Sequence, residues 1–158
     1  VFVTYNALEN FAFGYHSFFY TQRKSSATVY TYTSWLEGVD DAFSVPSPDA
    51  TTLAHEIAEA SHDPLITSLT LLWGDAFRHN RCFQKYIEVG DAVEDAPAPQ
   101  QLWEQTVQSG GTVKTYTLQT EALLPWFERQ TPSTVLGGAY SFPDVASLTT
   151  AAPLTCVK

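Results

Sequence analysis

The sequence contains no long hydrophobic run, no methionine and only two cysteines among its 158 residues. A membrane-spanning helix needs about 20 mainly apolar residues, and no stretch of this chain approaches that length. Positive charge is also scarce, because 8 Lys and Arg stand against 17 Asp and Glu, giving a formal net charge of -9. Such a charge repels phosphate backbones and anionic lipid surfaces, so we expect neither nucleic acid nor a membrane as a partner.

The two cysteines, Cys82 and Cys156, are far apart in the sequence and do not form a CxxC pair of the kind that zinc ribbons and redox sites use. We expect them to form one disulfide that ties the C-terminal tail to the middle of the chain; two free buried thiols are the alternative. Together with the acidic composition, a disulfide is typical of a secreted, extracellular protein.

The composition supplies ample core material, with 44% hydrophobic residues that include 10 Phe, 8 Tyr and 4 Trp. The length fits one domain, so we expect residues 1–158 to form a single secreted domain and a monomer. The chain begins at Val1, in a strand-like run and without methionine, which suggests a mature product whose leader and pro-segment have been removed. A cloned fragment would begin in the same way.

The residue pattern predicts a mixture of strands and helices, and therefore an α+β fold. A helix is expected over residues 49–63, with Ser47 as its N-cap, Pro48 at its first position and Pro64 ending it. The tail from Thr131 onward is rich in Gly and Pro and should run over the surface. Strands are expected at Val1 to Tyr5 (as a buried strand), Ser26 to Ser34 and Thr112 to Gln119, and a short helix at Gln101 to Gln108.

The predicted helix carries its ionisable residues on one side. At 100° per residue, five side chains that could bind a metal share one face, and apolar side chains take the opposite arc. The helix should therefore present an apolar back to the core and an ionisable front to a cleft. The front comprises His55, Glu56, Glu59, His62 and Asp63, and the back comprises Leu53, Ala54, Ile57, Ala58 and Leu65.

This spacing is typical of a variant zinc-metalloprotease helix. Residues i and i+4 lie one turn apart on the same face, so His55 and Glu59 can reach one zinc ion. Glu56 follows the first ligand directly, which is the placement of a general base acting on a water molecule. The familiar HExxH helix has His at the i+4 position, and Glu59 adds negative charge there, which also favours a harder cation such as calcium.

The alternative is the solvated face of an amphipathic helix on an acidic protein. Two observations favour a metal over that alternative. His55 and His62 are two of only four histidines, and the neighbouring carboxylates interleave with them. No basic residue lies between Lys24 and Arg78, so neutralisation within this segment must come from protons, from distant residues or from a metal.

Three short stretches resemble a zincin-like group related to the plant phosphate-induced (exordium) proteins, which has relatives in bacteria and fungi. They are Gly14 to His16, the helix from His55 to Pro64, and Glu88 to Asp91. The sequence departs from the family pattern at His62, where the family usually has Thr, and members usually begin further upstream. The resemblance implies a zincin-like domain in which a mixed sheet packs on the active-site helix.

It also implies a metal held by His55, Glu59 and a carboxylate from the stretch Glu88 to Asp91. We favour Asp91 as this third ligand, because Gly90 lets the chain turn sharply, although an ordinary Gly-Asp turn would look the same. Glu88, His62 and Asp63 are the other candidates.

The remaining site candidate is His16, which could hydrogen-bond a developing oxyanion beside the metal. A histidine satisfied within the core is the alternative explanation of this residue.

The sequence thus predicts a secreted zinc-dependent hydrolase, an endopeptidase that acts on peptide or protein substrates. In this prediction, Glu56 activates water on a metal held by His55 and Glu59. The alternative is a non-catalytic, metal-stabilised secreted module that binds cell-wall polysaccharide or protein, a hypothesis motivated by the Glu59 substitution and by the aromatic residues from Tyr15 to Tyr20.

Overall fold

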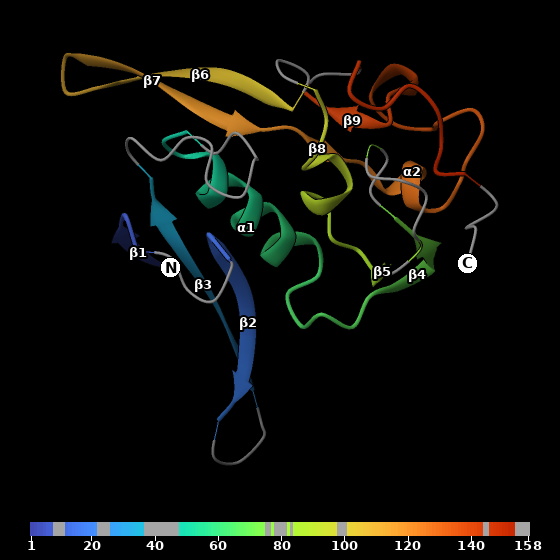
Figure 1. Cartoon of the computed structure of the whole chain (residues 1–158), viewed down its shortest axis with the longest axis horizontal. Coiled ribbons are helices and arrows are strands. Elements are labelled where there is room, and N and C mark those ends of the chain that lie inside the picture. Colours follow the sequence, from blue (N-terminus) through green and yellow to red (C-terminus); the bar gives the residue numbers. More distant parts are fainter. Residues whose placement is uncertain are drawn as a thin grey trace.

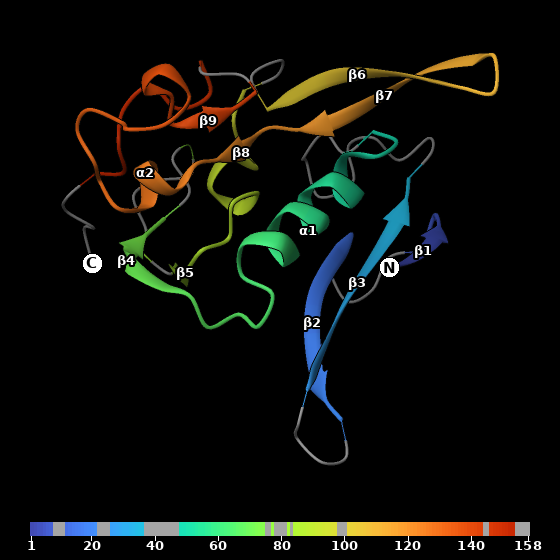
Figure 2. The same cartoon turned by 180° about the vertical axis from the view of Figure 1, so that it is seen from behind.

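The structure of the chain is a computed structural model. It describes residues 1–7, 12–21, 26–36, 48–74, 77, 82, 84–97, 101–143 and 146–153. Helix α1 (Thr51–His62) crosses the middle of the molecule, with a three-stranded sheet on one side and a long hairpin together with the C-terminal half of the chain on the other (Figures 1 and 2). The protein therefore has an α+β architecture, as the sequence predicted.

The three-stranded sheet is mixed. It contains β1 (Phe2–Tyr5), β2 (Gly14–Tyr20) and β3 (Ala27–Trp35) in the order β1-β3-β2. Strand β3 pairs in parallel with β1 and antiparallel with β2. The expected mixed sheet beside the helix is thus present. However, the prediction that Val1 to Tyr5 is a buried strand was wrong, because Val1, Phe2, Val3 and Tyr5 are all more than half exposed at the sheet edge.

The rest of the sheet structure consists of two-stranded units. Each unit pairs two strands that follow one another in the chain. The pairs are β4 (Leu69–Trp73) with β5 (Gln84–Tyr86), β6 (Leu102–Ser109) with β7 (Thr112–Gln119), and β8 (Glu121–Ala122) with β9 (Ser141–Phe142). Three short helices complete the fold: η2 (Asp91–Val93), α2 (Leu124–Phe127) and η3 (Leu136–Gly138).

The short helix predicted from Gln101 to Gln108 was wrong, because this segment forms strand β6. Its partner β7 has the bounds predicted from the sequence. The two strands are joined by Gly110 and Gly111, which have φ values of 57° and 79°. Positive φ at both central residues is typical of the tight turns that match the twist of a hairpin, so the Gly-Gly pair was the signal for two strands.

The main hydrophobic core lies in the C-terminal half of the molecule. Trp73 packs against Trp126 and Phe127, with ring centroids 5.7 and 5.2 Å apart. The tail was expected to run over the surface from Thr131 onward, and that expectation was wrong. The tail contributes Tyr140, Leu148 and Ala152 to this core, where they pack in one cluster with the aromatic side chains.

Helix α1 begins at Thr51, two residues later than expected, and its N-cap is Ala50. Asp49 precedes it with a φ of 37°, and its carboxylate accepts hydrogen bonds from the backbone N–H groups of Ala50 and Thr117. The predicted N-cap, Ser47, lies outside the described residues. The helix ends at His62, directly before Asp63 and Pro64, as expected. None of the described helices is both long enough and apolar enough to cross a membrane.

The two faces of α1 are buried in the opposite sense to the prediction. The carboxyl side chains of the front are inside, since Glu56 is 6% exposed and Glu59 4% exposed. On the apolar back, Ile57 is 43% exposed, and only Ala58 belongs to the core. The reason is that the sheet β1-β3-β2 and the segment before η2 cover the ionisable front, whereas the back lines an open groove.

Candidate metal centre

Three segments of the chain bring histidine and carboxylate side chains together against the front of α1. The helix provides His55 and Glu59, strand β2 provides His16, and the stretch before and into η2 provides Glu88 and Asp91. Two groups could each hold a metal ion, with ligand atoms within 4.8 Å of one another. One group is His55, Glu59 and Asp91, and the other is His16, Glu59 and Glu88, so Glu59 belongs to both.

The first group has the geometry that the sequence predicted. The Nε2 atom of His55 lies 3.2 Å from Oε1 of Glu59 and 3.4 Å from Oδ1 of Asp91. The same Glu59 oxygen accepts hydrogen bonds from the backbone N–H groups of Gly90 and Asp91, at 3.1 and 3.2 Å. These bonds fix the turn that carries Asp91 to the helix, and they hold Glu59 in place.

Gln119, at the end of β7, orients the His55 ring. Its side-chain N–H donates to the carbonyl oxygen of Gly90 at 2.8 Å, so its Oε1 faces Nδ1 of His55, 3.0 Å away. The network assigns the proton of His55 to Nδ1, which donates to Gln119. Nε2 of His55 then faces Glu59 and Asp91, where it carries a proton in the charged ring or offers its lone pair to a metal ion.

Gly90 is needed because the His55 ring packs directly on its backbone. A Cβ atom built on Gly90 would lie 2.5 to 2.7 Å from three atoms of that ring. Gly90 has a φ of -78°, an ordinary value for any residue, so the requirement is for space alone. Gly90 is therefore needed for the close approach of the His55 ring and not, as the sequence analysis expected, for the conformational freedom of a sharp turn.

The second group is centred on His16, which is deeply buried. Its Nε2 faces the carbonyl oxygen of Asp63 at 3.3 Å, a contact in which the ring nitrogen must donate. Nδ1 of His16 faces two carboxylates, with Oε2 of Glu56 and Oε2 of Glu59 each 3.7 Å away. Glu88, 7% exposed, completes the group.

Gly14 allows β2 to approach the helix at this point. A Cβ atom on Gly14 would meet Cγ of Glu56 at 2.8 Å and the side chain of Thr52 at 2.9 Å. The Gly14 to His16 stretch is thus a close contact between strand and helix, and it delivers His16 to the carboxylates.

Burial and mutual repulsion shift the pKa values of the carboxylates. Burial raises the pKa of Glu88 to about 8, and the neighbouring charge of Glu59 adds to this rise. Burial also raises the pKa of Glu59, although the adjacent His55 opposes the shift. The pKa of Asp91 is lowered: burial would raise it, but the hydrogen bond and charge of His55 prevail.

Both histidines favour their charged form despite being buried. Burial by itself would lower the pKa of His55, but Glu59 and Asp91 raise it well above the usual value. The pKa of His16 is raised in the same way by Glu56, Glu59 and Glu88 against the effect of burial. The site therefore attracts positive charge, which a proton or a metal ion can supply.

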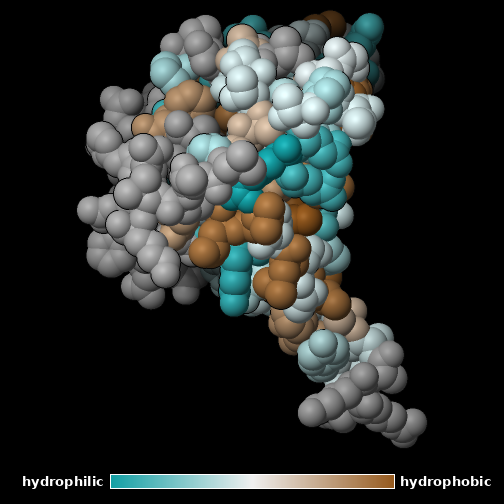
Figure 3. Space-filling model, turned by 90° about the vertical axis from the view of Figure 1, so that its right-hand side faces the viewer, coloured by the Kyte–Doolittle hydropathy of each residue, from teal (hydrophilic) through white to brown (hydrophobic). Residues whose placement is uncertain are grey.

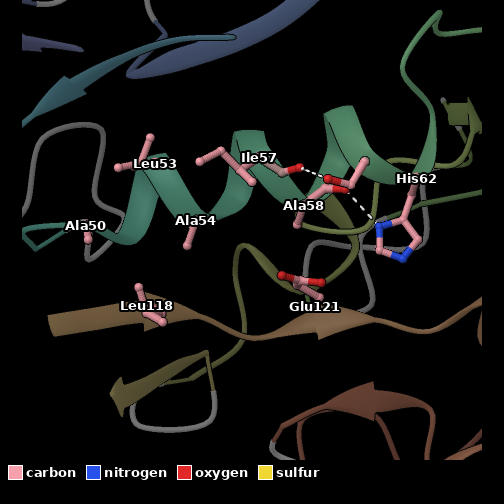
Figure 4. Close-up of a pocket in the computed structure, with 9 residues that line it drawn as sticks. Ala50, Leu53, Ala54, Ile57, Ala58, His62, Leu118 and Glu121 are labelled. Carbon is pink, nitrogen blue, oxygen red and sulfur yellow. Dashed lines mark hydrogen bonds between the residues drawn. The ribbon is translucent and has the colours of Figure 1, made fainter. Parts of the chain in front are cut away.

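Two of the sequence candidates lie apart from these groups. Nδ1 of His62 faces the carbonyl oxygen of Ala58 at 2.8 Å, and its ring lies toward Glu121 across the groove on the back of α1 (Figure 4). Asp63 is 1% exposed, and its carboxylate accepts three hydrogen bonds from the backbone N–H groups of Thr67 and Ser68. Asp63 thus holds the turn after the helix.

The groove beside His62 has a volume of about 490 Å³ and is lined mainly by the apolar back of α1. Glu121 stands on its far wall, and burial raises the pKa of this carboxyl, although His62 opposes the rise. Further exposed apolar side chains occur on other strands, including Leu69, Leu71 and Leu72 of β4. Figure 3 shows hydrophobic side chains gathered on one side of the molecule, next to the projecting β2–β3 hairpin.

Sequence reasoning missed Gln119. A glutamine at the end of a predicted strand has no special signal, and it becomes important only because β7 passes beside α1. The disulfide predicted between Cys82 and Cys156 stays a prediction, since Cys156 lies outside the described residues.

No known protein family, no curated protein and no solved structure matches the chain. The resemblance to the phosphate-induced proteins therefore stays a prediction that rests on the three motifs.

Proposed function

We propose that this protein is a secreted, zinc-dependent hydrolase with a zincin-like domain, and that it acts as an endopeptidase. The observation that carries the proposal is the buried group of His55, Glu59 and Asp91, with Glu56 one residue from the first ligand. Among the described residues, the ion pairs of these carboxylates involve histidine alone, never Lys or Arg. Buried carboxylates without basic partners typically coordinate a metal.

The donor set fits a zinc ion. An imidazole nitrogen and carboxylate oxygens are established zinc ligands, and three protein ligands leave one position open, as in catalytic sites. The orienting hydrogen bond from His55 to Gln119 is the kind of support that zinc-binding histidines generally have. Zinc bound there would lower the pKa of a coordinated water and polarise a substrate carbonyl.

The chemistry of the chain itself falls to Glu56. As a carboxylate it can take a proton from water while the oxygen adds to the carbonyl carbon of a peptide bond. The same carboxyl group can then give that proton to the leaving amine nitrogen when the C–N bond breaks. Access to the site is easiest from the Asp91 side, because the Asp91 side chain is 31% exposed, compared with 13% for His55.

In this proposal His16 is not assigned to an oxyanion. The side chain of His16 is only 5% exposed, and its Nδ1 faces the carboxylates of Glu56 and Glu59.

The test is the Glu56→Gln variant. We expect wild-type protein loaded with zinc to cleave an unstructured protein such as casein, and the variant to lose at least about a hundredfold in rate, the usual contribution of a general base. The bound zinc and the melting temperature should remain close to those of the wild type. A matched control is Glu121→Gln, which removes a partly buried carboxylate on the other face of the helix. Zinc binding below a tenth of an equivalent, with no activity on adding zinc, would contradict the proposal.

The second candidate is a non-catalytic, metal-stabilised module that binds polysaccharide or protein. It is favoured by the aromatic side chains that β2 exposes, since Phe19 and Tyr20 are each 54% exposed. This candidate predicts that Glu56→Gln leaves every function intact, whereas Phe19→Ala with Tyr20→Ala abolishes binding to cell-wall polysaccharide.

A further inference from the structure

The carboxylate of Glu59 directs one oxygen toward each histidine. Oε1 lies 3.2 Å from Nε2 of His55, and Oε2 lies 3.7 Å from Nδ1 of His16. The two imidazole rings reach it from different elements, His55 from α1 itself and His16 from β2. A carboxylate placed in this way can bridge two cations.

On the side of Glu59 that faces His16, a carboxylate oxygen of Glu88 lacks a hydrogen-bond partner among the described residues. Glu88 is only 7% exposed, and this oxygen, Oε2, is buried. Leaving such an oxygen unpaired costs free energy comparable to a lost hydrogen bond, and more if it is charged. Glu88 lies with His16 and Glu59 in one group whose ligand atoms are within 4.8 Å of one another.

The contacts of the His16 ring also indicate a cation on this side of Glu59. Because its Nε2 must donate to the carbonyl oxygen of Asp63, a neutral ring has its Nδ1 lone pair directed at Glu56 and Glu59. A lone pair and two carboxylate oxygens repel one another unless a cation lies between them. That cation is either a proton on Nδ1 or a metal ion.

Four ionised carboxylates carry more negative charge than a single divalent ion balances. Four carboxylates, those of Glu56, Glu59, Glu88 and Asp91, lie beside the two imidazoles, and none of them pairs with a Lys or Arg in the part of the chain that the structure describes. When all four are ionised, one divalent ion balances two of them and a second ion balances the other two.

We infer that the centre holds two divalent cations bridged by Glu59, with His16 and Glu88 as the ligands of the second ion. The first ion, on which the proposed function rests, is bound by His55 and Asp91. Paired divalent ions of this kind, typically about 3.5–4 Å apart, are used by aminopeptidases and phosphatases to stabilise both attacking and leaving atoms. Glu56 borders the second ion, because its Oε2 lies at the same distance from His16 as that of Glu59.

The test is the zinc stoichiometry of the full chain. Protein stripped with chelator is dialysed against micromolar free zinc, and bound zinc is measured by elemental analysis. We expect two equivalents in the wild type and one in both Glu88→Gln and His16→Asn. The control pair Glu121→Gln and His62→Asn changes the same residue types on the opposite face of α1 and should keep two equivalents. Circular dichroism melting checks that each variant is folded.

The other outcomes separate this inference from the proposed function. The wild type could instead bind one equivalent of zinc, which Asp91→Asn abolishes and Glu88→Gln leaves intact. This result would overturn the second ion and keep the first, and a proton would then take the place of the metal at His16. Two equivalents that neither Glu88→Gln nor His16→Asn reduces would also overturn it, because the second ion would then bind elsewhere. No bound zinc at all would overturn both proposals. Should His16→Asn fail to fold, anomalous scattering at the zinc edge from wild-type crystals decides, with two peaks expected on either side of Glu59.

Discussion

At the scale of single residues, the centre depends on side chains that surround the ligands as much as on the ligands themselves. Gly90 makes room for the His55 ring, and Gly14 makes room for the side chain of Glu56. Gln119 fixes which nitrogen of His55 faces the carboxylates. None of these three residues would bind a metal, yet Gly90 and Gln119 set the position of the candidate ligand His55, and Gly14 sets that of the proposed base Glu56.

Gln119→Leu tests this dependence. The substitution keeps the size of the side chain but removes the acceptor for Nδ1–H of His55, so the ring is no longer held in one orientation. We expect zinc affinity to fall about 10- to 100-fold, the usual effect of losing such a supporting residue. Competition with a fluorescent zinc chelator measures the change.

Gln101→Leu is the matched control, because Gln101 is also a buried glutamine, 1% exposed, directly before β6. Neither the nitrogen nor the oxygen of its side-chain amide has a hydrogen-bond partner among the described residues. Equal zinc affinities for wild type and Gln119→Leu would show that Gln119 does not orient His55.

At the scale of the elements, α1 is unusual because its charged face is buried and its apolar face is partly exposed. The periodicity of the helix was sufficient to separate the two faces, but it could not show which face the rest of the chain covers. A sheet and a turn cover the ionisable face, and they bring further ligands with them. The opposite face meets β7, and an open groove lined by α1, Leu118 and Glu121 remains there.

Two neighbouring residues of α1 should therefore respond differently to the same substitution. Ile57→Gln, at a position 43% exposed, should change the free energy of unfolding by no more than about 0.5 kcal/mol. Ala58→Gln forces a larger polar side chain into the core cluster and should cost about 1–3 kcal/mol. Urea denaturation of the two variants, each compared with wild type in chelator, gives both values. A larger loss for Ile57→Gln than for Ala58→Gln would mean that the apolar face is packed after all.

At the scale of the whole molecule, the buried cluster links stability to pH. A carboxyl group whose pKa is raised on folding binds more protons in the folded state than in the unfolded state, so stability falls as pH rises through that interval. For Glu88 the interval runs from the ordinary value of 4.5 to about 8. The raised pKa values of His16 and His55 act in the same direction, because their stabilisation is lost as pH rises through the folded values.

We therefore expect metal-free protein to lose thermal stability steadily from about pH 5 to pH 8. Zinc should restore the melting temperature most strongly at the alkaline end, where the carboxylates no longer hold protons. Glu88→Gln, which cannot ionise, should show a shallower decline in chelator. Calorimetric melting at several pH values measures all three effects, and a metal-free protein that becomes more stable toward pH 8 would contradict the expectation.

The sequence by itself determined the α+β class, strand β7 and the bounds of α1 to within two residues. These features depend on local patterns, such as β-branched alternation, helical periodicity and Pro64 as a stop signal. Helical spacing also singled out His55 and Glu59, whereas Asp91 and His16 were suggested by the short motifs that carry the family resemblance.

Only the tertiary structure decided which of these residues meet. It brought Asp91, Glu88 and His16 to the helix, directed His62 away from them and gave Asp63 a purely backbone role. It also placed the tail in the core and the carboxylates of α1 inside. The physical reason is that helical periodicity fixes only the angle between side chains of one element. Which face is buried, and beside which ligands, depends on contacts between residues far apart in the sequence.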